Sequence, residues 1–236
     1  MLSEFEDRAE PSEGFSLKSQ QMLKYSKNLG KEPSEGFSKT RTANRNIIEP
    51  ELLLNAYRCG IFPMAESKEG EIHWYEPQLR AVVPLDGLKV SRSLRQTLKK
   101  KIFDIRLNIS FEAVMRRCAD REETWISEAI IQSYCELHRR GFAYSVESWH
   151  DGEIAGGLYG VALGGAFFGE SMFSRMKDAS KSALVALVHH LQQRQFVLLD
   201  AQFMTPHLKS LGAVEMPQRE YLGRLHTALR LNRSFM

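Results

Sequence analysis

The segment between residues 143 and 170 most constrains the fold, because its pattern predicts three consecutive antiparallel strands. Apolar and polar residues alternate over residues 143–149, and Asp151-Gly152 then gives the strongest short-range signal for a two-residue hairpin turn. A second strand is expected to return over residues 153–163. Gly164-Gly165 turns the chain again, into a third, apolar strand at residues 166–170.

A helix and one more strand follow these three strands. Apolar residues recur at helical spacing over residues 180–194, and residues 196–199 form a short apolar run typical of a buried strand. Strand, helix and strand at this spacing make a crossover unit, so the strands ending at Glu170 and at Asp200 are predicted to be parallel. Their carboxyl ends then share one edge, where open sheets tend to bind ligands.

Glu170, Asp200 and Gln202 are the candidate catalytic residues at that edge. Asp200 and Gln202 are two residues apart, so in extended backbone their side chains face the same side. Taken singly, Asp200 is typical of a capping aspartate, Gln202 of a turn glutamine, and Glu170 of a solvated acidic residue at a strand end. Their convergence favours a functional site, because together they could position an amine, accept its proton and donate to a developing oxyanion.

The composition argues against several classes of protein. No stretch of the 236 residues approaches the roughly 18 apolar residues of a membrane span, and no apolar run follows a basic start as in a secretory signal. Three separated cysteines without a C-x-x-C pair predict reduced thiols in a cytoplasmic protein. The net charge of +3 permits an anionic partner without requiring one.

The first 46 residues differ from the rest of the chain. They are polar and contain the heptapeptide E-P-S-E-G-F-S twice, at residues 10–16 and 32–38. Such a composition buries too little apolar surface to offset the entropy of ordering. We expect a disordered leader over residues 1–46, with a segment that folds on a partner as the alternative.

Two ordered parts are expected after the leader. Residues 47–90 predict a small N-terminal α/β domain with a helix that starts at Pro50 and strands at residues 72–75 and 81–84. The order of predicted helices and strands over residues 91–236 indicates an α+β, acyltransferase-like catalytic domain. It should open with a basic helix, a strand and two further helices, at residues 91–101, 103–107, 110–118 and 128–140.

The basic helix carries a stripe of positive charge. Arg92, Arg95 and Lys99 recur at helical spacing, and Lys100 and Lys101 follow directly. This stripe could lie along the phosphate backbone of a nucleic acid, or it could be an ordinary solvated helix face.

Other candidate sites are weaker. No glycine-rich phosphate loop opens a helix, and His189-His190 has no cysteine or carboxylate at metal-ligand spacing, so no metal site is expected. Several aromatic and soft residues could line a substrate pocket, although such residues more often form the core: Met64, Trp125, Tyr134, Phe167, Met172 and Phe173.

Several short stretches, taken in order, identify a family. They are A-Y-R-C-G-I-F-P-M (residues 56–64), S-R-S-L (91–94), E-T-W-I (123–126), Y-S-V-E-S-W (144–149), G-G-L-Y-G-V (156–161), G-E-S-M-F-S-R (169–175), D-A-Q (200–202) and H-L-K-S-L-G-A (207–213). Over residues 50–225 the chain closely resembles the leucyl/phenylalanyl-tRNA–protein transferases. These bacterial enzymes move Leu or Phe from aminoacyl-tRNA onto an N-terminal Arg or Lys.

The resemblance implies a fold and a set of partners. It implies an acetyltransferase-like (GNAT-type) mixed sheet with helices behind a small N-terminal domain, with no metal and no organic cofactor. The expected partners are Leu-, Phe- or Met-tRNA and proteins with N-terminal Arg or Lys, which the transfer marks for N-degron degradation. We expect a monomer.

The resemblance also implies residue roles. Asp200 and Gln202 would carry the transfer, and Glu170 would help hold the substrates. Leu158, Phe167 and Leu199 would line the pocket for the amino-acid side chain. Trp125 matches a tryptophan that contacts the terminal adenosine of the tRNA, and Met64 replaces its usual aromatic companion.

A mechanism follows from the chemistry of an activated ester. No ATP is needed, but an α-amine with a reference pKa of about 7.7–8.0 is largely protonated at neutral pH, so attack requires proton removal. Asp200 would be the base, or it would polarise Gln202, whose amide would orient the amine or the oxyanion. Two alternatives are an acyl-CoA-dependent N-acetyltransferase, disfavoured because residues 174–180 contain no glycine, and a non-catalytic RNA-binding module.

Overall fold

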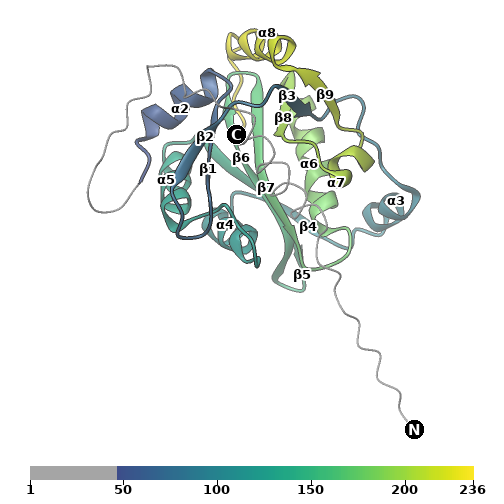
Figure 1. Ribbon diagram of the computed structural model, residues 1–236. Coiled ribbons are helices and arrows are strands. Elements are labelled where there is room, and N and C mark those ends of the chain that lie inside the picture. The colour runs from purple at the N-terminus through teal and green to yellow at the C-terminus, as the bar shows by residue number, and fades with distance from the viewer. Residues whose placement is uncertain (1–46) are drawn as a thin grey trace.

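A seven-stranded sheet forms the centre of the computed structural model, which describes residues 47–236 (Figure 1). Its strands, in spatial order, are β4 (Asp104–Leu107), β5 (Ala143–His150), β6 (Glu153–Leu163), β7 (Ala166–Ser174), β8 (Leu198–Gln202), β3 (Leu79–Val82) and β9 (Val214–Pro217). All neighbours are antiparallel except β7 and β8, which are parallel. A mixed sheet with helices is thus confirmed, and the leader predicted at residues 1–46 lies outside the described residues.

The predicted hairpin between β5 and β6 is confirmed by its backbone angles. Asp151 has φ 48° and Gly152 has φ 81°. Two consecutive positive φ angles characterise the tight turn whose twist matches that of antiparallel strands. This turn sets the register of β5 and β6, which pair from Ala143↔Val161 to His150↔Glu153.

The crossover from β7 through α6 (Ala179–Gln193) to β8 is also present. The parallel register runs from Ala166↔Leu198 to Phe168↔Asp200. Beyond Phe168, β7 continues to Ser174 with its registered pairs on β6. The two parallel strands therefore pair over their first three residues and part at the level of Asp200.

Three strands differ from the expectation by more than one residue at a boundary. The strand expected to end at Glu170 is β7, which continues to Ser174 because it stays paired with β6. The strand expected at residues 196–199 is β8, which starts at Leu198 and contains Asp200 and Gln202 instead of ending before them. It continues because β3 pairs with it along its other edge, at Ala81↔Gln202 and Val82↔Asp200. β3 itself starts at Leu79, so the charged Arg80 lies inside a central strand.

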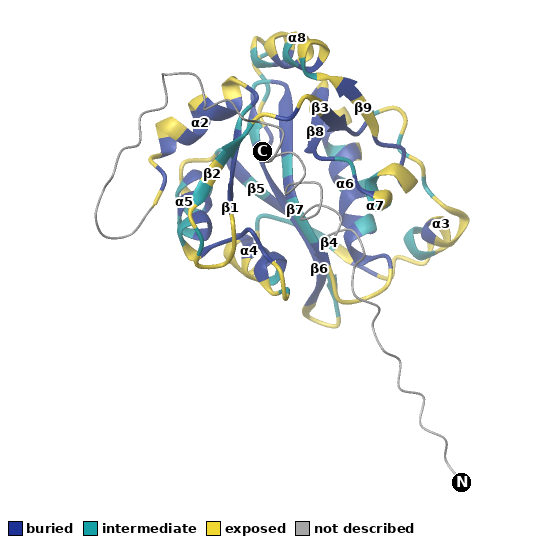
Figure 2. Cartoon of the chain, in the orientation of Figure 1, coloured by how far each residue is buried: buried dark blue, intermediate teal, exposed yellow. Residues whose placement is uncertain are grey.

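Helices cover both faces of the sheet. On one face, α6 packs on a core that includes Leu158, Phe167 and Leu199. The second core, on the other face, is completed by α2 (Pro50–Arg58), α4 (Phe111–Ala119), α5 (Glu128–Arg139), α8 (Gln218–Leu229) and the two-stranded sheet of β1 (Phe62–Ala65) and β2 (Ile72–Tyr75). Figure 2 shows the central strands buried between these layers.

Three of the described helices start at a serine or threonine side-chain cap, including the cap expected at Ser127. The Ser127 hydroxyl accepts a hydrogen bond from the Ile130 amide at the start of α5, and Ser91 accepts from Leu94 at the start of α3 (Arg92–Lys99). Such a cap contributes about 1 kcal/mol to helix stability. The short helix α7 (Pro206–Ser210) is capped in the same way by Thr205.

Within residues 47–236, no helix combines the length and the apolar character needed to cross a membrane. β3, which belongs to the predicted N-terminal part, pairs with β8 and β9 in the large sheet, whereas β1 and β2 form a sheet of their own. The domain boundary at residue 90 stays a prediction.

Candidate active site

The structure brings Glu170, Asp200 and Gln202 together beside the point where β7 and β8 part. The Gln202 side-chain amide donates a hydrogen bond of 2.8 Å to Glu170 Oε1, and the Gln202 backbone N–H donates one of 2.8 Å to Asp200 Oδ1. All three residues are buried, with exposed fractions of 2%, 0% and 0%. They form a hydrogen-bonded group inside the protein, not a solvated sheet edge.

Two β-bulges aim these side chains at one another. In the pairing of β6 with β7, Tyr159 lies opposite Ser171 and Gly160 lies opposite Gly169, so Glu170 is the extra residue. In the pairing of β3 with β8, a second register shift makes Ala201 the extra residue. Bulges often redirect a side chain next to an active site.

Gln202 also has an unusual backbone conformation. Its φ of 63° lies in the left-handed region. For a residue other than glycine this costs of order 1–3 kcal/mol, and such strain gathers at functional sites. The cost is offset here by the hydrogen bonds that hold the Gln202 backbone and side chain.

Two tyrosines support Glu170 from the neighbouring helices. Tyr57 of α2 donates a 2.5 Å hydrogen bond to Glu170 Oε1, and its hydroxyl also contacts that of Tyr134 on α5. Burial, with the nearby Glu170 carboxylate, raises the pKa of both phenols well above the ordinary value, so they remain protonated donors. Tyr134, a predicted pocket residue, therefore belongs to the carboxylate network.

Arg80 is the main residue that the sequence reasoning did not find. It is 1% exposed, and its Nε and Nη2 donate to the two oxygens of Asp200 at 2.9 and 2.6 Å. Its guanidinium lies over the rings of Phe62 and Tyr221, 4.6 and 4.5 Å from their centroids. Burial, the largest single influence, lowers the pKa of Arg80, but Asp200, Tyr221 and Glu170 together outweigh burial and raise it.

The hydrogen bonds to Asp200 limit what its carboxylate can do. Oδ1 accepts from Arg80 and from the Gln202 backbone, while Oδ2 accepts from Arg80 and from the Tyr221 hydroxyl at 2.8 Å. Every favourable acceptor position is therefore occupied by a protein donor. Of the two roles that the sequence left open, this geometry favours holding and polarising Gln202 over acting as the base.

One acceptor of this group that no described protein donor reaches is the side-chain oxygen of Gln202. Because Nε2 faces the Glu170 carboxylate, Oε1 is the atom that points elsewhere. It is buried and has no hydrogen-bond partner among the described residues. A buried acceptor left unpaired costs about 1–3 kcal/mol, a cost that an N–H donor from a substrate would remove.

The chain matches known proteins over most of the residues that form this site. A sequence model described as "Leucyl/phenylalanyl-tRNA protein transferase" matches residues 82–226, and one for the N-terminal domain of that transferase matches residues 46–78. Proteins named leucyl/phenylalanyl-tRNA–protein transferase match as well: the one from Rubrobacter xylanophilus is 57% identical over 189 residues, covering 80% of this chain and 98% of that protein, and the one from Chlorobaculum tepidum is 54% identical over 194 residues, covering 80% and 100%.

The chain belongs to the leucyl/phenylalanyl-tRNA–protein transferase family. This membership favours the transferase over an acyl-CoA-dependent N-acetyltransferase and over a non-catalytic RNA-binding module. Among solved structures, the C-terminal DUF2156 domain of an Agrobacterium fabrum protein aligns with 76% of this chain and 63% of that chain, at 12% identity and a TM-score of 0.32. That likeness is too weak to assign a fold.

The predicted substrate-pocket residues of this transferase lie on opposite faces of the sheet. Leu158, Phe167 and Leu199 pack together under α6. Met64 and Trp125 lie in the core of the other face, and β1 binds the segment before α5 through the Ala65 N–H and the Trp125 carbonyl, 3.1 Å apart. The residues predicted to bind the amino-acid side chain and those predicted to bind adenosine thus form two groups separated by the sheet.

The cationic side chains of the basic helix of the transferase are exposed. Arg92, Arg95 and residues 99–101 are all exposed, and Leu94 anchors the opposite side of α3 in the protein. The Thr97 hydroxyl also donates to Asp178, at the start of α6, over 3.2 Å. Both a solvated face and a tRNA contact fit this arrangement.

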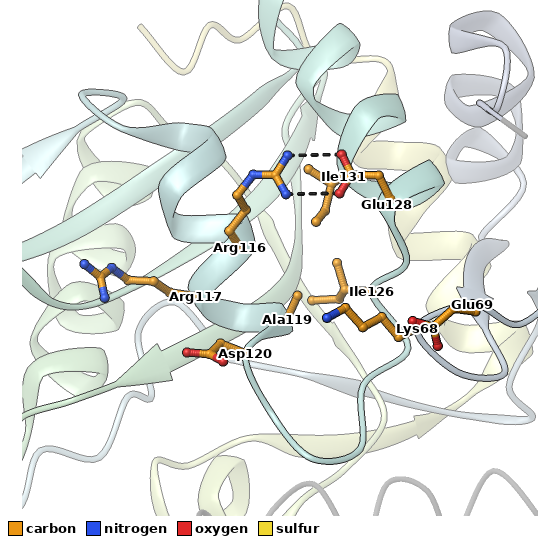
Figure 3. A pocket seen from close by; sticks show the side chains of 9 residues that line it. All are labelled: Lys68, Glu69, Arg116, Arg117, Ala119, Asp120, Ile126, Glu128 and Ile131. Atoms are coloured by element: carbon orange, nitrogen blue, oxygen red, sulfur yellow. Dashed lines mark hydrogen bonds and ion pairs between the residues drawn. The ribbon is translucent and has the colours of Figure 1, made fainter. Parts of the chain in front are cut away.

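One surface cavity of the transferase lies apart from these residues. It has a volume of about 430 Å³ and lies beside α4, the start of α5 and the β1–β2 turn (Figure 3). Arg116 spans it with two 3.0 Å hydrogen bonds to Glu128. None of the predicted site residues lines it, so the candidate chemistry is not located there.

Proposed function

We propose that this protein transfers Leu, Phe or Met from aminoacyl-tRNA to the N-terminal Arg or Lys of proteins, and so marks them for degradation. Family membership makes it an aminoacyltransferase that uses aminoacyl-tRNA and protein N-termini. The structural observation that supports the chemistry is the buried, unpartnered Gln202 Oε1 beside Glu170. We further propose that the protein acts in the cytoplasm as a monomer.

The proposed mechanism assigns the amine to Gln202. The neutral α-amine donates one N–H to Gln202 Oε1, and this hydrogen bond directs the lone pair of the amine nitrogen at the ester carbonyl. The cationic side chain of the incoming Arg or Lys is attracted by the Glu170 carboxylate. The new C–N bond forms as the bond from the carbonyl carbon to the 3′ oxygen of adenosine breaks. The amine loses a proton and the leaving oxygen gains one. Asp200 and Arg80 keep the Gln202 backbone in place throughout.

We propose that the acyl ester lies where β7 and β8 part. That position faces the apolar residues Leu158, Phe167 and Leu199 on one side of the sheet and Gln202 on the other. A parallel strand pair that parts beside the reacting group supports the predicted acetyltransferase-like class for residues 91–236. A small N-terminal domain at residues 47–90 completes this proposal.

We also propose that α3 contacts the phosphates of the tRNA. The support is the exposed cationic stripe of Arg92, Arg95 and residues 99–101. Lysine and arginine side chains that replace condensed counterions give binding that weakens steeply with salt.

One assay tests the proposed function. The protein is incubated with labelled Leu-tRNA and peptides that begin with Arg, Lys, Asp or Ala, without ATP or CoA. We expect label in the Arg and Lys peptides alone, with Gln202→Ala as the inactive control. Label in none of the peptides, together with acetylation from labelled acetyl-CoA, would overturn the proposal in favour of an N-acetyltransferase.

A further inference from the structure

The last residues of the chain form a strap across the face of the sheet that α6 covers. After α8, Phe235 is 1% exposed although it is the penultimate residue. His190 Nε2 on α6 lies 2.6 Å from the Phe235 carbonyl oxygen, and Arg233 Nε donates to the Gln195 carbonyl over 3.2 Å. These contacts give a role to His190, which the sequence left unexplained.

The Phe235 ring fills a site lined by aromatic rings. It stacks on Tyr144 of β5 with centroids 4.4 Å apart, and it lies 5.3 Å from Phe167 of β7. His190 and Phe196 lie on its other sides, with centroids at 4.5 and 6.4 Å. Aromatic pairs at these distances contribute beyond the area that they bury, so the strap is packed as part of the core.

Phe167 is therefore held from two directions. Its ring occupies the space above Gly160, where a Cβ would come within 2.4 Å of it, and Gly160 lies on the same strand as Leu158. Phe235 packs against Phe167 as well. Because protein interiors are close-packed, a wall held in this way can recede only if the group behind it is removed.

We propose that Phe235 is a specificity-determining residue that sets the depth of the pocket for the transferred amino-acid side chain, by fixing the position of Phe167. This inference rests on the proposed function, in which Phe167 lines that pocket. It extends the pocket to a part of the chain beyond residue 226, where the match to the family's sequence model ends. The expected ligand is the apolar side chain of a 3′-aminoacyl adenosine.

The test compares two donors that differ only in that side chain, Leu-adenosine and Phe-adenosine, with an Arg-initiated peptide as acceptor. Phe235→Ala should raise the ratio of kcat/KM for Phe over Leu by about 10-fold or more, since one methylene changes discrimination by 10–200-fold. Phe235→Leu should give a smaller rise in the same direction. Met236→Ala, which changes an exposed neighbour, should leave the ratio at the wild-type value.

The ratio is chosen because partial unfolding lowers both activities equally and leaves it unchanged. A wild-type ratio in Phe235→Leu and in any folded Phe235→Ala would overturn the inference and leave the proposed function standing. If Phe235→Ala does not fold, Phe235→Leu decides. A wild-type protein that transfers neither donor and no aminoacyl-tRNA would overturn the proposed function, and the inference with it.

Discussion

Replacing Arg80 with methionine should destabilise the protein strongly, although the substitution keeps a long side chain. Arg80 and Asp200 are 1% and 0% exposed, and the substitution removes every arginine hydrogen bond to a carboxylate that stays buried. Removing one partner of a buried ion pair costs about 3–5 kcal/mol, because the remaining charge is uncompensated. That is a large fraction of the stability of a typical domain, about 5–15 kcal/mol.

Urea denaturation followed by circular dichroism measures this loss. The control is Arg224→Met, which breaks an exposed ion pair with Glu220 and should cost at most about 1 kcal/mol. Adding Asp200→Asn to Arg80→Met removes the stranded charge and should restore much of the lost stability. If Arg80→Met lowered the free energy of unfolding by less than about 1 kcal/mol, the conclusion that Arg80 compensates the buried charge of Asp200 would be refuted.

Three further predictions concern catalysis, tRNA binding and pH. Gln202→Ala and Asp200→Asn should each slow single-turnover transfer by about 10²-fold with little change in tRNA binding. The rate of the double variant should fall by much less than the product of the two single effects. Near-normal transfer by either single variant would remove that residue from the mechanism. Changing the lysines at residues 99–101 to alanine should raise the KM for aminoacyl-tRNA and flatten the salt dependence of that KM. Transfer from aminoacyl-adenosine should stay intact. Normal use of tRNA at every salt concentration would show that α3 is only a solvated helix face. Burial raises the pKa of Tyr57 and Tyr134 above the ordinary value of 10.0, so these tyrosines ionise at lower pH in the unfolded chain than in the folded protein. The free energy of unfolding should therefore be retained below pH 10 and fall above it, and the fall should be less steep in Tyr57→Phe. Equilibrium unfolding measured across this pH range tests the prediction.

Local patterns were enough to predict the part of the fold made of neighbouring segments. The turn at Asp151-Gly152 follows from its two turn residues, and the crossover from β7 to β8 follows from the helical periodicity between them. Both signals can be read from short stretches of sequence. The meeting of Glu170 and Gln202 could be predicted from the parallel order of those two strands.

Arg80 could not be predicted in this way. A charged residue inside a central strand contradicts the apolar pattern, and its partner Asp200 is far away in the sequence. The bulges at Glu170 and Ala201 were also not predictable, because each depends on the register of another strand. The pairing of β3 with β8 brings Arg80 next to Asp200, whose oxygens also accept hydrogen bonds from Tyr221 and the Gln202 backbone.

The distance along the chain between the partners in this network bears on when activity can appear during synthesis. Arg80 and Asp200 are 120 residues apart, and Tyr57 and Glu170 are 113 apart. Contacts of such long range form slowly, because the closure of a long loop precedes any gain from the contact. On the ribosome, β3 must wait with an unpaired edge until β8 emerges. The nascent protein therefore has no assembled Gln202 site until the residues up to Tyr221 have been made.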